Sequence, residues 1–295
     1  MDWRLALLLH CPLGLKISSL ELDELVRSQM PIHSPHQVAD FVKNPRGQAY
    51  LKQNPNWSEA SNTILRRSRE HGIYWTYPYQ CDYPQAWLHL SVRPAIMSYR
   101  GTPVWMHNKA LFSVVGSRTP RPDTILWMQR ELSAFLEARD LVVVSGGARG
   151  VDQWAHRIAI DSGRPTICVF PTGLLNPYPL EAKSLWEKIL QHKGCLVSTF
   201  ALEQPLYKAL FAIRNRWITG LSRALFVVEG NRRSGSLLTG KLAFDENRTV
   251  CTLPVFPLCD QGLGNLDLLE QGALMIRDHR DLVTLFDREL SPGFT

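Results

Sequence analysis

The stretch LVVVSGGARGVDQWAH, residues 141–156, decides the fold class. A short apolar run that favours a strand enters a turn of small residues, and a helical pattern begins directly after that turn. A strand that leads into a helix in this way is the repeating unit of a parallel sheet with helices on both faces. The N–H groups at the start of such a helix lack backbone partners and attract anions, so the turn is also a candidate binding site.

The same alternation continues from about residue 111. Apolar runs separated by amphipathic stretches predict parallel strands that are covered on both faces. The predicted strands are LFSVVG (111–116), LVVVSG (141–146), TICVF (166–170), CLVST (195–199), ALFVVEG (224–230), TVCTLP (249–254) and ALMI (273–276), and the predicted helices span residues 123–139, 151–162, 182–192 and 237–246. We therefore predict an α/β fold with a doubly wound, mostly parallel sheet that binds ligands at the carboxyl ends of its strands.

The first 70 residues have a different composition. A leucine-rich stretch from residue 5 to about residue 30 predicts a helix, and the clusters PIHSPH, KNPRG and QNPNW interrupt any long element after it. The sequence predicts a small helical N-terminal domain with a connector over residues 1–70 and the α/β domain over residues 71–295. His33 and His36 lie in the first of these clusters without nearby cysteines or acids, so we interpret them as loop residues.

Composition narrows the class of protein. The chain carries 33 basic and 27 acidic residues, for a net charge of +6, which permits a polyanionic partner without requiring one. No apolar run approaches the roughly 20 residues that cross a bilayer, so we expect a cytoplasmic protein without membrane contact. The cysteines form no C-x-x-C pair and predict buried thiols in a reducing compartment, without a disulfide framework or a metal site. They are Cys11, Cys81, Cys168, Cys195, Cys251 and Cys259.

Four predicted strand ends carry residues suited to bind an anion: 114–122, 145–152, 170–179 and 229–240. Glycines let a phosphate approach the backbone, and the arginines at positions 118 and 149 add planar, permanently charged donors. The predicted phosphate-binding residues are Gly116, Ser117, Arg118, Ser145, Gly146, Gly147, Arg149 and Gly150. Further possible contacts are Arg214, Asn215, Arg216, Ser234, Gly235, Ser236 and Trp154. Between residues 208 and 248 the chain carries eight basic and only three acidic residues. Positive charge is therefore concentrated in this half of the domain, which favours an anionic ligand there.

Other interpretations of these residues stay open. The glycines at 146, 147 and 150 could serve only a sharp turn, and neither G-x-G-x-x-G nor a phosphate-binding P-loop motif occurs. Asp152 and His156 lie one helical turn apart and could act as a catalytic pair, but no nucleophile accompanies them, so we predict structural hydrogen bonds and no catalytic residue. Trp154 and Trp217 could stack on bases, although core packing is the commoner role. Ser234 and Ser236 resemble N-cap residues.

A family resemblance follows from blocks in a fixed order: YPQAWLHLSVRPAIMSYRG from residue 83, VVGSR at 114–118, SGGARGVDQWAH at 145–156, RNRWITGLS at 214–222 and VVEGNRRSGSLLT at 227–239. Together they resemble the DNA-processing protein A family, also called Smf. The resemblance implies an extended Rossmann-like domain that binds single-stranded DNA without catalysis or a cofactor, forms homodimers and delivers the strand to the recombinase RecA during natural transformation. It implies that Arg118, Ser145, Gly146 and Arg149 hold DNA phosphates.

The chain departs from the family pattern at TPRPDT after Arg118, at Trp217 and at LPVFP after residue 252. The last change leaves the geometry of the final loop open. We expect no winged-helix module after DLVTLFDREL. The alternative is a nucleotide-binding or nucleoside-monophosphate-hydrolysing protein of the same broad fold. The phosphoribohydrolase family that shares this general fold carries a PGGxGT loop, which is absent here, and Glu229 would then be the residue of interest. A third possibility is an interaction protein whose pocket has lapsed.

Overall fold

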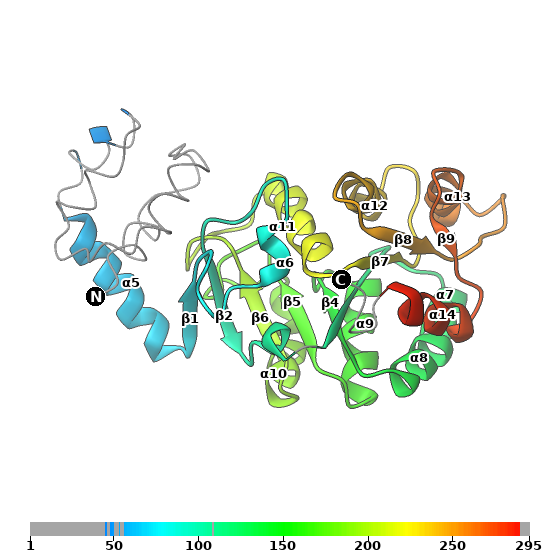
Figure 1. Cartoon of the computed structure of the whole chain (residues 1–295), viewed down its shortest axis with the longest axis horizontal. Helices are drawn as coiled ribbons and strands as arrows, with labels where there is room; N and C mark the ends of the chain where they lie inside the picture. Colours follow the sequence, from blue (N-terminus) through cyan, green and yellow to red (C-terminus); the bar gives the residue numbers. More distant parts are fainter. Residues whose placement is uncertain (1–44, 46–47, 50–52, 54–55, 108, 290–295) are drawn as a thin grey trace.

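The computed structural model describes residues 45, 48–49, 53, 56–107 and 109–289. A nine-stranded sheet runs through the molecule in the order β1-β2-β6-β5-β4-β3-β7-β8-β9 (Figure 1). The strands are β1 Ile73–Thr76, β2 Met97–Gly101, β3 Ala110–Val115, β4 Leu141–Ser145, β5 Thr166–Val169, β6 Cys195–Ser198, β7 Ala224–Val227, β8 Thr249–Thr252 and β9 Leu274–Met275. The predicted helix at residues 5–30, His33, His36 and Cys11 lie outside the described residues, so the predicted domain boundary at residue 70 stays a prediction.

All seven predicted strands form, and they pair in parallel from β6 to β9. Strands β4 to β7 are buried along their whole length, which is why each appears in the sequence as a continuous apolar run. The prediction missed β1 and β2, which pair antiparallel with each other and with β6. Strand β1 has only four residues, of which the first and last are buried and the two between them are exposed or half-buried, so it lacks the pattern of a buried strand.

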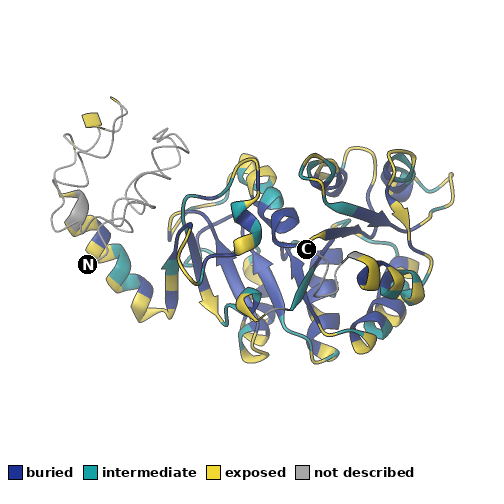
Figure 2. Cartoon of the chain, viewed as in Figure 1, coloured by how far each residue is buried: buried dark blue, intermediate teal, exposed yellow. Residues whose placement is uncertain are grey.

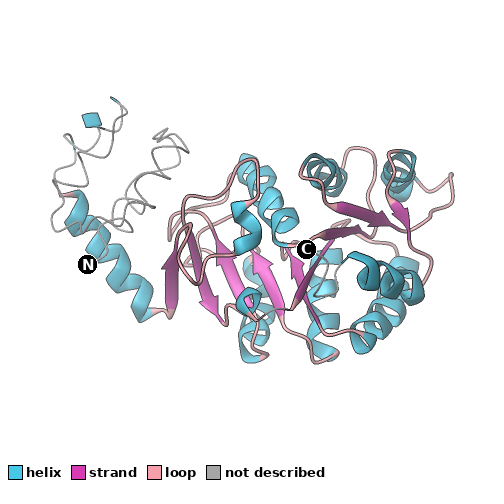
Figure 3. Ribbon diagram, in the orientation of Figure 1, coloured by secondary structure: helices cyan, strands magenta, loops and turns pink. Residues whose placement is uncertain are grey.

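Helices cover both faces of the sheet, as a doubly wound fold requires (Figure 3). Helices α6, α11, α12 and α13 pack on one face, and α7, α8, α9, α10 and α14 pack on the other. Their bounds are α5 Trp57–Glu70, α6 Gln85–Leu88, α7 Pro122–Trp127, α8 Ser133–Ala138, α9 Val151–Asp161, α10 Lys183–Gln191, α11 Lys208–Leu221, α12 Gly235–Asp245, α13 Leu263–Glu270 and α14 His279–Glu289. A π-helical turn, Met128–Leu132, joins α7 to α8 within the predicted helix 123–139.

The core consists of a layer of apolar side chains on each face of the sheet. The central strands of the sheet are buried (Figure 2). On one face, the rings of Trp87 and Trp217 lie 5.9 Å apart, and Trp87 Nε1 donates to the Trp217 carbonyl at 3.1 Å. This confirms that Trp217 packs in the core. On the other face, α9 contributes Val151, Ala155 and Ile158, whose spacing of four and three residues places them on one side of the helix.

The cysteine prediction was partly wrong. Cys168, Cys195 and Cys251 lie on buried strands as expected, but Cys81 is exposed and Cys259 is half-buried. The two exceptions lie in loops, where no sheet neighbour covers them. Within the described ranges all five of these thiols are free, and no cluster of three metal-ligating side chains occurs. The same part of the chain holds no helix long and apolar enough to cross a membrane.

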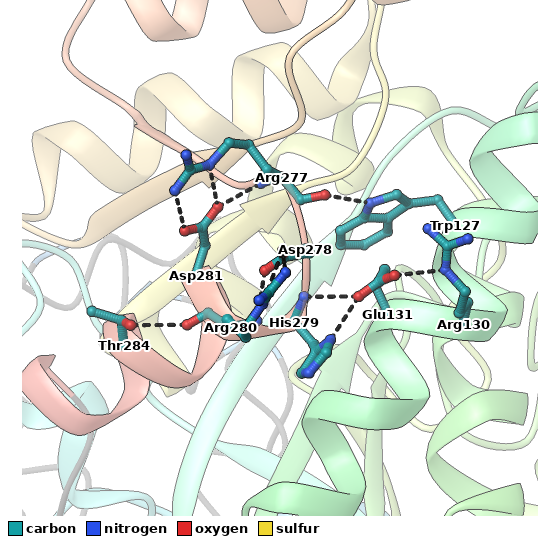
Figure 4. Close-up of polar contacts among 9 residues, drawn as sticks. All are labelled: Trp127, Arg130, Glu131, Arg277, Asp278, His279, Arg280, Asp281 and Thr284. Carbon is teal, nitrogen blue, oxygen red and sulfur yellow. Dashed lines mark hydrogen bonds and ion pairs between the residues drawn. The ribbon is translucent and has the colours of Figure 1, made fainter.

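The last helix is fastened to the π-helical turn (Figure 4). The buried carboxylate of Glu131 accepts bonds from His279 Nδ1 at 2.7 Å and from the His279 backbone N–H at 3.0 Å. Arg130 Nε lies 2.6 Å from the same carboxylate, and Trp127 Nε1 donates to the Arg277 carbonyl at 2.9 Å. The bonds of His279 and of Trp127 join two segments that lie 148 and 150 residues apart in the chain.

Candidate functional site

The two predicted arginine loops lie side by side, because β3 and β4 are neighbours in the sheet. The Val151 N–H at the start of α9 donates to the Ser117 carbonyl at 3.0 Å. Gly150 has φ +88°, and a Cβ there would overlap the Ser117 carbonyl, so only glycine permits this approach. The glycines of the turn therefore bring the loop after β3 and the loop after β4 to one edge of the sheet.

A cleft of about 480 Å³ opens at this edge. It is lined by Arg118, Ala148, Arg149, Gln153, Tyr178, Pro179, Glu181 and Ala182. Arg118 and Arg149 are both exposed, and neither forms a salt bridge with a carboxylate that the structure describes. The guanidinium of Arg118 lies over the ring of Phe211, 4.9 Å from its centroid. Two exposed guanidinium groups are thus available to a ligand at the carboxyl ends of two adjacent strands.

A buried ion pair lies beneath the glycine-rich loop after β4. Arg214 and Asp152 are 3% and 4% exposed, and Arg214 Nη1 lies 3.7 Å from Asp152 Oδ2. The Ala148 N–H donates to the same Asp152 oxygen at 3.2 Å, so the carboxylate also binds the loop backbone. A Cβ at Gly146 would overlap the Arg214 guanidinium. Burial raises the pKa of Asp152 and lowers the pKa of Arg214, and in each case the charge of the partner opposes the shift.

Arg214 and its neighbours on α11 do not line the cleft. Arg214 is buried, and its guanidinium lies beside Asp152 and under Gly146 of the loop. Asn215 Nδ2 donates to Thr239 Oγ1 of α12 at 2.8 Å, and Arg216 is half-buried. Trp154 is half-buried on α9, packs against the core, and carries the Arg157 guanidinium 5.4 Å from its ring centroid. None of these four residues is among those that line the cleft.

The smaller predicted residues shape the loops. Ser145 is buried, and its hydroxyl donates to the Val114 carbonyl at 2.6 Å, so only its backbone faces the turn. Gly147 has φ +70° and packs against Trp186. In the first loop Gly116 packs against Val151, and Ser117 Oγ accepts the Thr119 N–H at 3.1 Å.

Glu229 at the end of β7 anchors the first loop. Its buried carboxylate accepts from Thr124 Oγ1 at 2.5 Å and from Arg121 Nε at 3.3 Å. The Arg121 backbone N–H donates to it as well, at 3.3 Å. A carboxylate with these partners holds the segment after Arg118 in place, which is a structural role.

Two residues hold the loop between β7 and α12: Ser234, which the sequence predicts, and Asn265, which it does not single out. Ser234 is the N-cap of α12, as predicted, and accepts the Leu237 N–H at 3.2 Å, while Ser236 Oγ lies 2.9 Å from Ser234 Oγ. Gly235 is exposed at the helix start. Buried Asn265 accepts from the Gly230 N–H at 2.9 Å and donates to two carbonyls, at 2.9 and 3.2 Å. The altered final segment therefore folds back onto this loop.

His156 is a structural residue, as predicted. Thr166 Oγ1 donates its only proton to the Val143 carbonyl, so it accepts a bond of 2.7 Å from His156 Nδ1, which must carry hydrogen. Burial, with smaller contributions from the charges of Arg214 and Arg157, lowers the pKa of His156 to about 3. The imidazole is neutral and bonded to a threonine, and the structure records no hydrogen bond between it and Asp152.

The cleft also contains residues that sequence reasoning did not select: Gln153, Tyr178 and Glu181. Tyr178 and Glu181 follow β5, which lies beside β4 in the sheet. The sequence predicts a strand end at 170–179, but placing its side chains at the cleft requires the order of the strands.

Comparison with known proteins identifies the family. Residues 75–287 match the family model of DNA recombination-mediator protein A. Protein Smf of Escherichia coli K12 is 31% identical over 277 residues, covering 91% of this chain and 72% of that protein. Protein Smf of Synechocystis is 32% identical over 223 residues, and the match covers 75% of this chain but only 56% of that protein.

Solved structures agree with the sequence matches. DNA processing protein A from Streptococcus pneumoniae superposes with a TM-score of 0.76 and 25% identity, covering 95% of this chain and 92% of that one. DNA processing protein A from Helicobacter pylori, whose structure concerns its single-stranded DNA binding mode, gives a TM-score of 0.65 at 26% identity over 73% of this chain and 97% of that one. Both solved structures agree with the Rossmann-like α/β fold of this chain. This chain belongs to the DNA recombination-mediator protein A family.

Proposed function

We propose that this protein binds single-stranded DNA through its phosphates, without sequence preference and without catalysis. The observation that carries the proposal is the pair of exposed arginines, Arg118 and Arg149, that line one cleft at the carboxyl ends of β3 and β4. Two planar forks beside a glycine-rich helix start suit phosphate oxygens, and contacts to phosphates carry no base sequence information. The predicted phosphate-binding residues Gly116, Ser117, Ser145, Gly146, Gly147 and Gly150 would form the backbone of that site.

The biological role that we propose follows from the family. The protein would act in the cytoplasm as a recombination mediator that protects an incoming strand and loads RecA onto it during natural transformation, and it would work as a homodimer. Residues 71–295 would form the DNA-binding domain, preceded by a small helical domain. Glu229 and His156 are both engaged in hydrogen bonds within the fold, to Thr124 and Thr166, which supports the proposal of a protein without catalysis.

A single nucleotide is the second candidate ligand. The cleft volume of about 480 Å³ lies within the range of small-molecule sites. A mononucleotide would use the same arginines for its phosphate. The two candidates differ in how affinity depends on the number of phosphates.

Fluorescence anisotropy tests both candidates. A labelled unstructured oligonucleotide is titrated at several salt concentrations, with a matched duplex and unlabelled mononucleotides as competitors. Strand binding predicts a preference for the single strand and a log affinity that falls against log salt by about 0.7 for each phosphate contacted. In a parallel titration, saturable binding of a labelled mononucleotide together with no affinity for the strand would contradict the proposal and favour the second candidate.

A further inference from the structure

The cleft has two unlike walls. Arg118 and Arg149 come from the loops after β3 and β4, whereas Tyr178, Pro179, Glu181 and Ala182 come from the segment after β5. The carboxylate of Glu181 repels a phosphate from the second wall, so a bound phosphate lies on the arginine side. The second wall instead offers an aromatic ring and a hydrogen-bond acceptor, which suit the face and the amino groups of a nucleobase.

The ring of Tyr178 is held in place by a second aromatic residue. Its side chain is 39% exposed, and it meets the Phe211 ring edge-on, with centroids 6.2 Å apart and an interplanar angle of 77°. The same Phe211 ring carries the Arg118 guanidinium at 4.9 Å and lies 5.7 Å from the Arg214 guanidinium. Phe211 therefore sets the position of the cationic wall relative to the aromatic wall.

Gln153 also lines the cleft. It is buried and makes two long hydrogen bonds of 3.4 Å, one to the Gly147 carbonyl and one from Arg157 Nη2. Its amide offers both a donor and an acceptor, which every nucleobase edge can use in some orientation. A cleft for bare phosphate would need neither this amide nor an aromatic wall.

We infer that Tyr178 is a nucleobase-stacking residue, and that the cleft takes one whole nucleotide of the strand, with its phosphate on Arg118 and Arg149 and its base on Tyr178. The inference rests on the proposed function, because it assigns the base of a strand whose phosphates the arginines hold. Stacking accepts every base, so this subsite adds affinity without adding sequence preference.

The test compares an oligonucleotide with an abasic oligonucleotide of the same length and phosphate number. For the wild type we expect tighter binding of the base-containing strand. Tyr178→Ala should lose about 5- to 100-fold of affinity for that strand and less than twofold for the abasic one. Tyr178→Phe keeps the ring and should bind like the wild type, whereas Tyr178→Leu keeps apolar bulk and should behave like the alanine variant.

Tyr74 provides a matched control. It is also an exposed tyrosine that leans on another aromatic ring, that of Tyr99 at 5.5 Å, but it lies on edge strand β1. Tyr74→Ala should leave both affinities unchanged, and thermal melting should show all variants folded.

The possible failures are distinct. If Tyr178→Ala weakens both oligonucleotides equally, or neither, the stacking role is overturned while strand binding by the arginines stands. If the wild type binds neither oligonucleotide, the proposed function and the inference fall together. A loss confined to the base-containing strand and rescued by phenylalanine supports the inference.

Discussion

Arg214 Nη1 lies 3.7 Å from Asp152 Oδ2, and both side chains are buried under the glycine-rich loop that follows β4. The pair links α11 to the first turn of α9, and Asp152 in turn accepts the Ala148 N–H of the loop. Arg149 is thus carried by a loop whose shape depends on a buried arginine that does not line the cleft. Stability and ligand affinity should respond together when this pair is broken.

Removing one partner of the pair should destabilise the fold strongly. Asp152→Asn leaves the Arg214 charge buried without its counter-charge, and we expect the free energy of unfolding to fall by about 3–5 kcal/mol. Urea denaturation measures it. Replacing both, as in Asp152→Leu with Arg214→Met, should cost less than the sum of the single changes. Glu70→Gln, which breaks the exposed pair with Arg66, is the control and should change stability by about 0.5 kcal/mol or less. Additive effects of the two buried changes would contradict the coupling.

Removing either arginine of the cleft should weaken DNA binding without unfolding the protein. Arg118→Ala and Arg149→Ala each delete an exposed charge, and we expect about tenfold weaker binding of single-stranded DNA with a change in melting temperature within error. The slope of log affinity against log salt should shrink by about 0.7 for each phosphate that the variant no longer binds. Arg66→Ala, an exposed arginine on α5, is the control. Unchanged affinity in both cleft variants would exclude the assignment.

His156 should make stability fall in mild acid. Its pKa is about 3 in the folded protein, against 6.5 ordinarily, so below pH 6.5 the unfolded chain takes up a proton that the native state does not. The free energy of unfolding should therefore drop by about 1.4 kcal/mol per pH unit from this residue alone as pH falls from 6.5 toward 3. Urea titrations between pH 6.5 and 5 should show this slope reduced by up to one proton in His156→Gln. Equal slopes in wild type and His156→Gln would contradict a neutral buried imidazole.

Glu131 should make the free energy of unfolding fall further at a lower pH than His156 does. The bonds from the His279 side chain and backbone, and from Arg130, hold the pKa of Glu131 at about 2. Its stabilisation is present in full above pH 4.5 and is lost as pH falls from 4.5 toward 2. Glu131→Gln should flatten the stability curve over that range and lower the free energy of unfolding near pH 7 by about 1–3 kcal/mol. Hydrogen exchange should localise the loss to α14. Unchanged exchange in α14 would show that other contacts hold this helix.

The parallel part of the fold could be predicted because a strand that is buried on both faces appears in the sequence as a continuous apolar run. Strands β4 and β7 are apolar at nearly every position, and the Ser145 hydroxyl that interrupts the pattern bonds to a neighbouring backbone carbonyl. Strand β1 is short and half-exposed, so its pattern matches no template, and its place at the edge depends on pairing with β2.

The candidate site was predictable for its exposed cations and less so for their surroundings. Arg118 and Arg149 follow predicted strands, and adjacent strand ends bring them to one cleft. Arg214 falls among the possible ligand contacts because a sequence does not reveal which side of a helix faces the interior when polar and apolar residues mix. Tyr178 joins the cleft through the order of β4 and β5, which only tertiary structure supplies.

The π-helical turn between α7 and α8 corrects a mismatch of periods. Thr124, Met128, Leu132 and Leu136 are all buried and recur every four residues. In an α-helix of 3.6 residues per turn, a four-residue repeat drifts by about 40° at each step, which would turn Leu136 roughly 120° away from Thr124. The wider turn absorbs much of that drift. The Thr124 hydroxyl, which bonds Glu229, and the Leu136 side chain can therefore face the same side of the helix. A single π-helical turn thus lets one helical segment both anchor a binding loop and pack against the core.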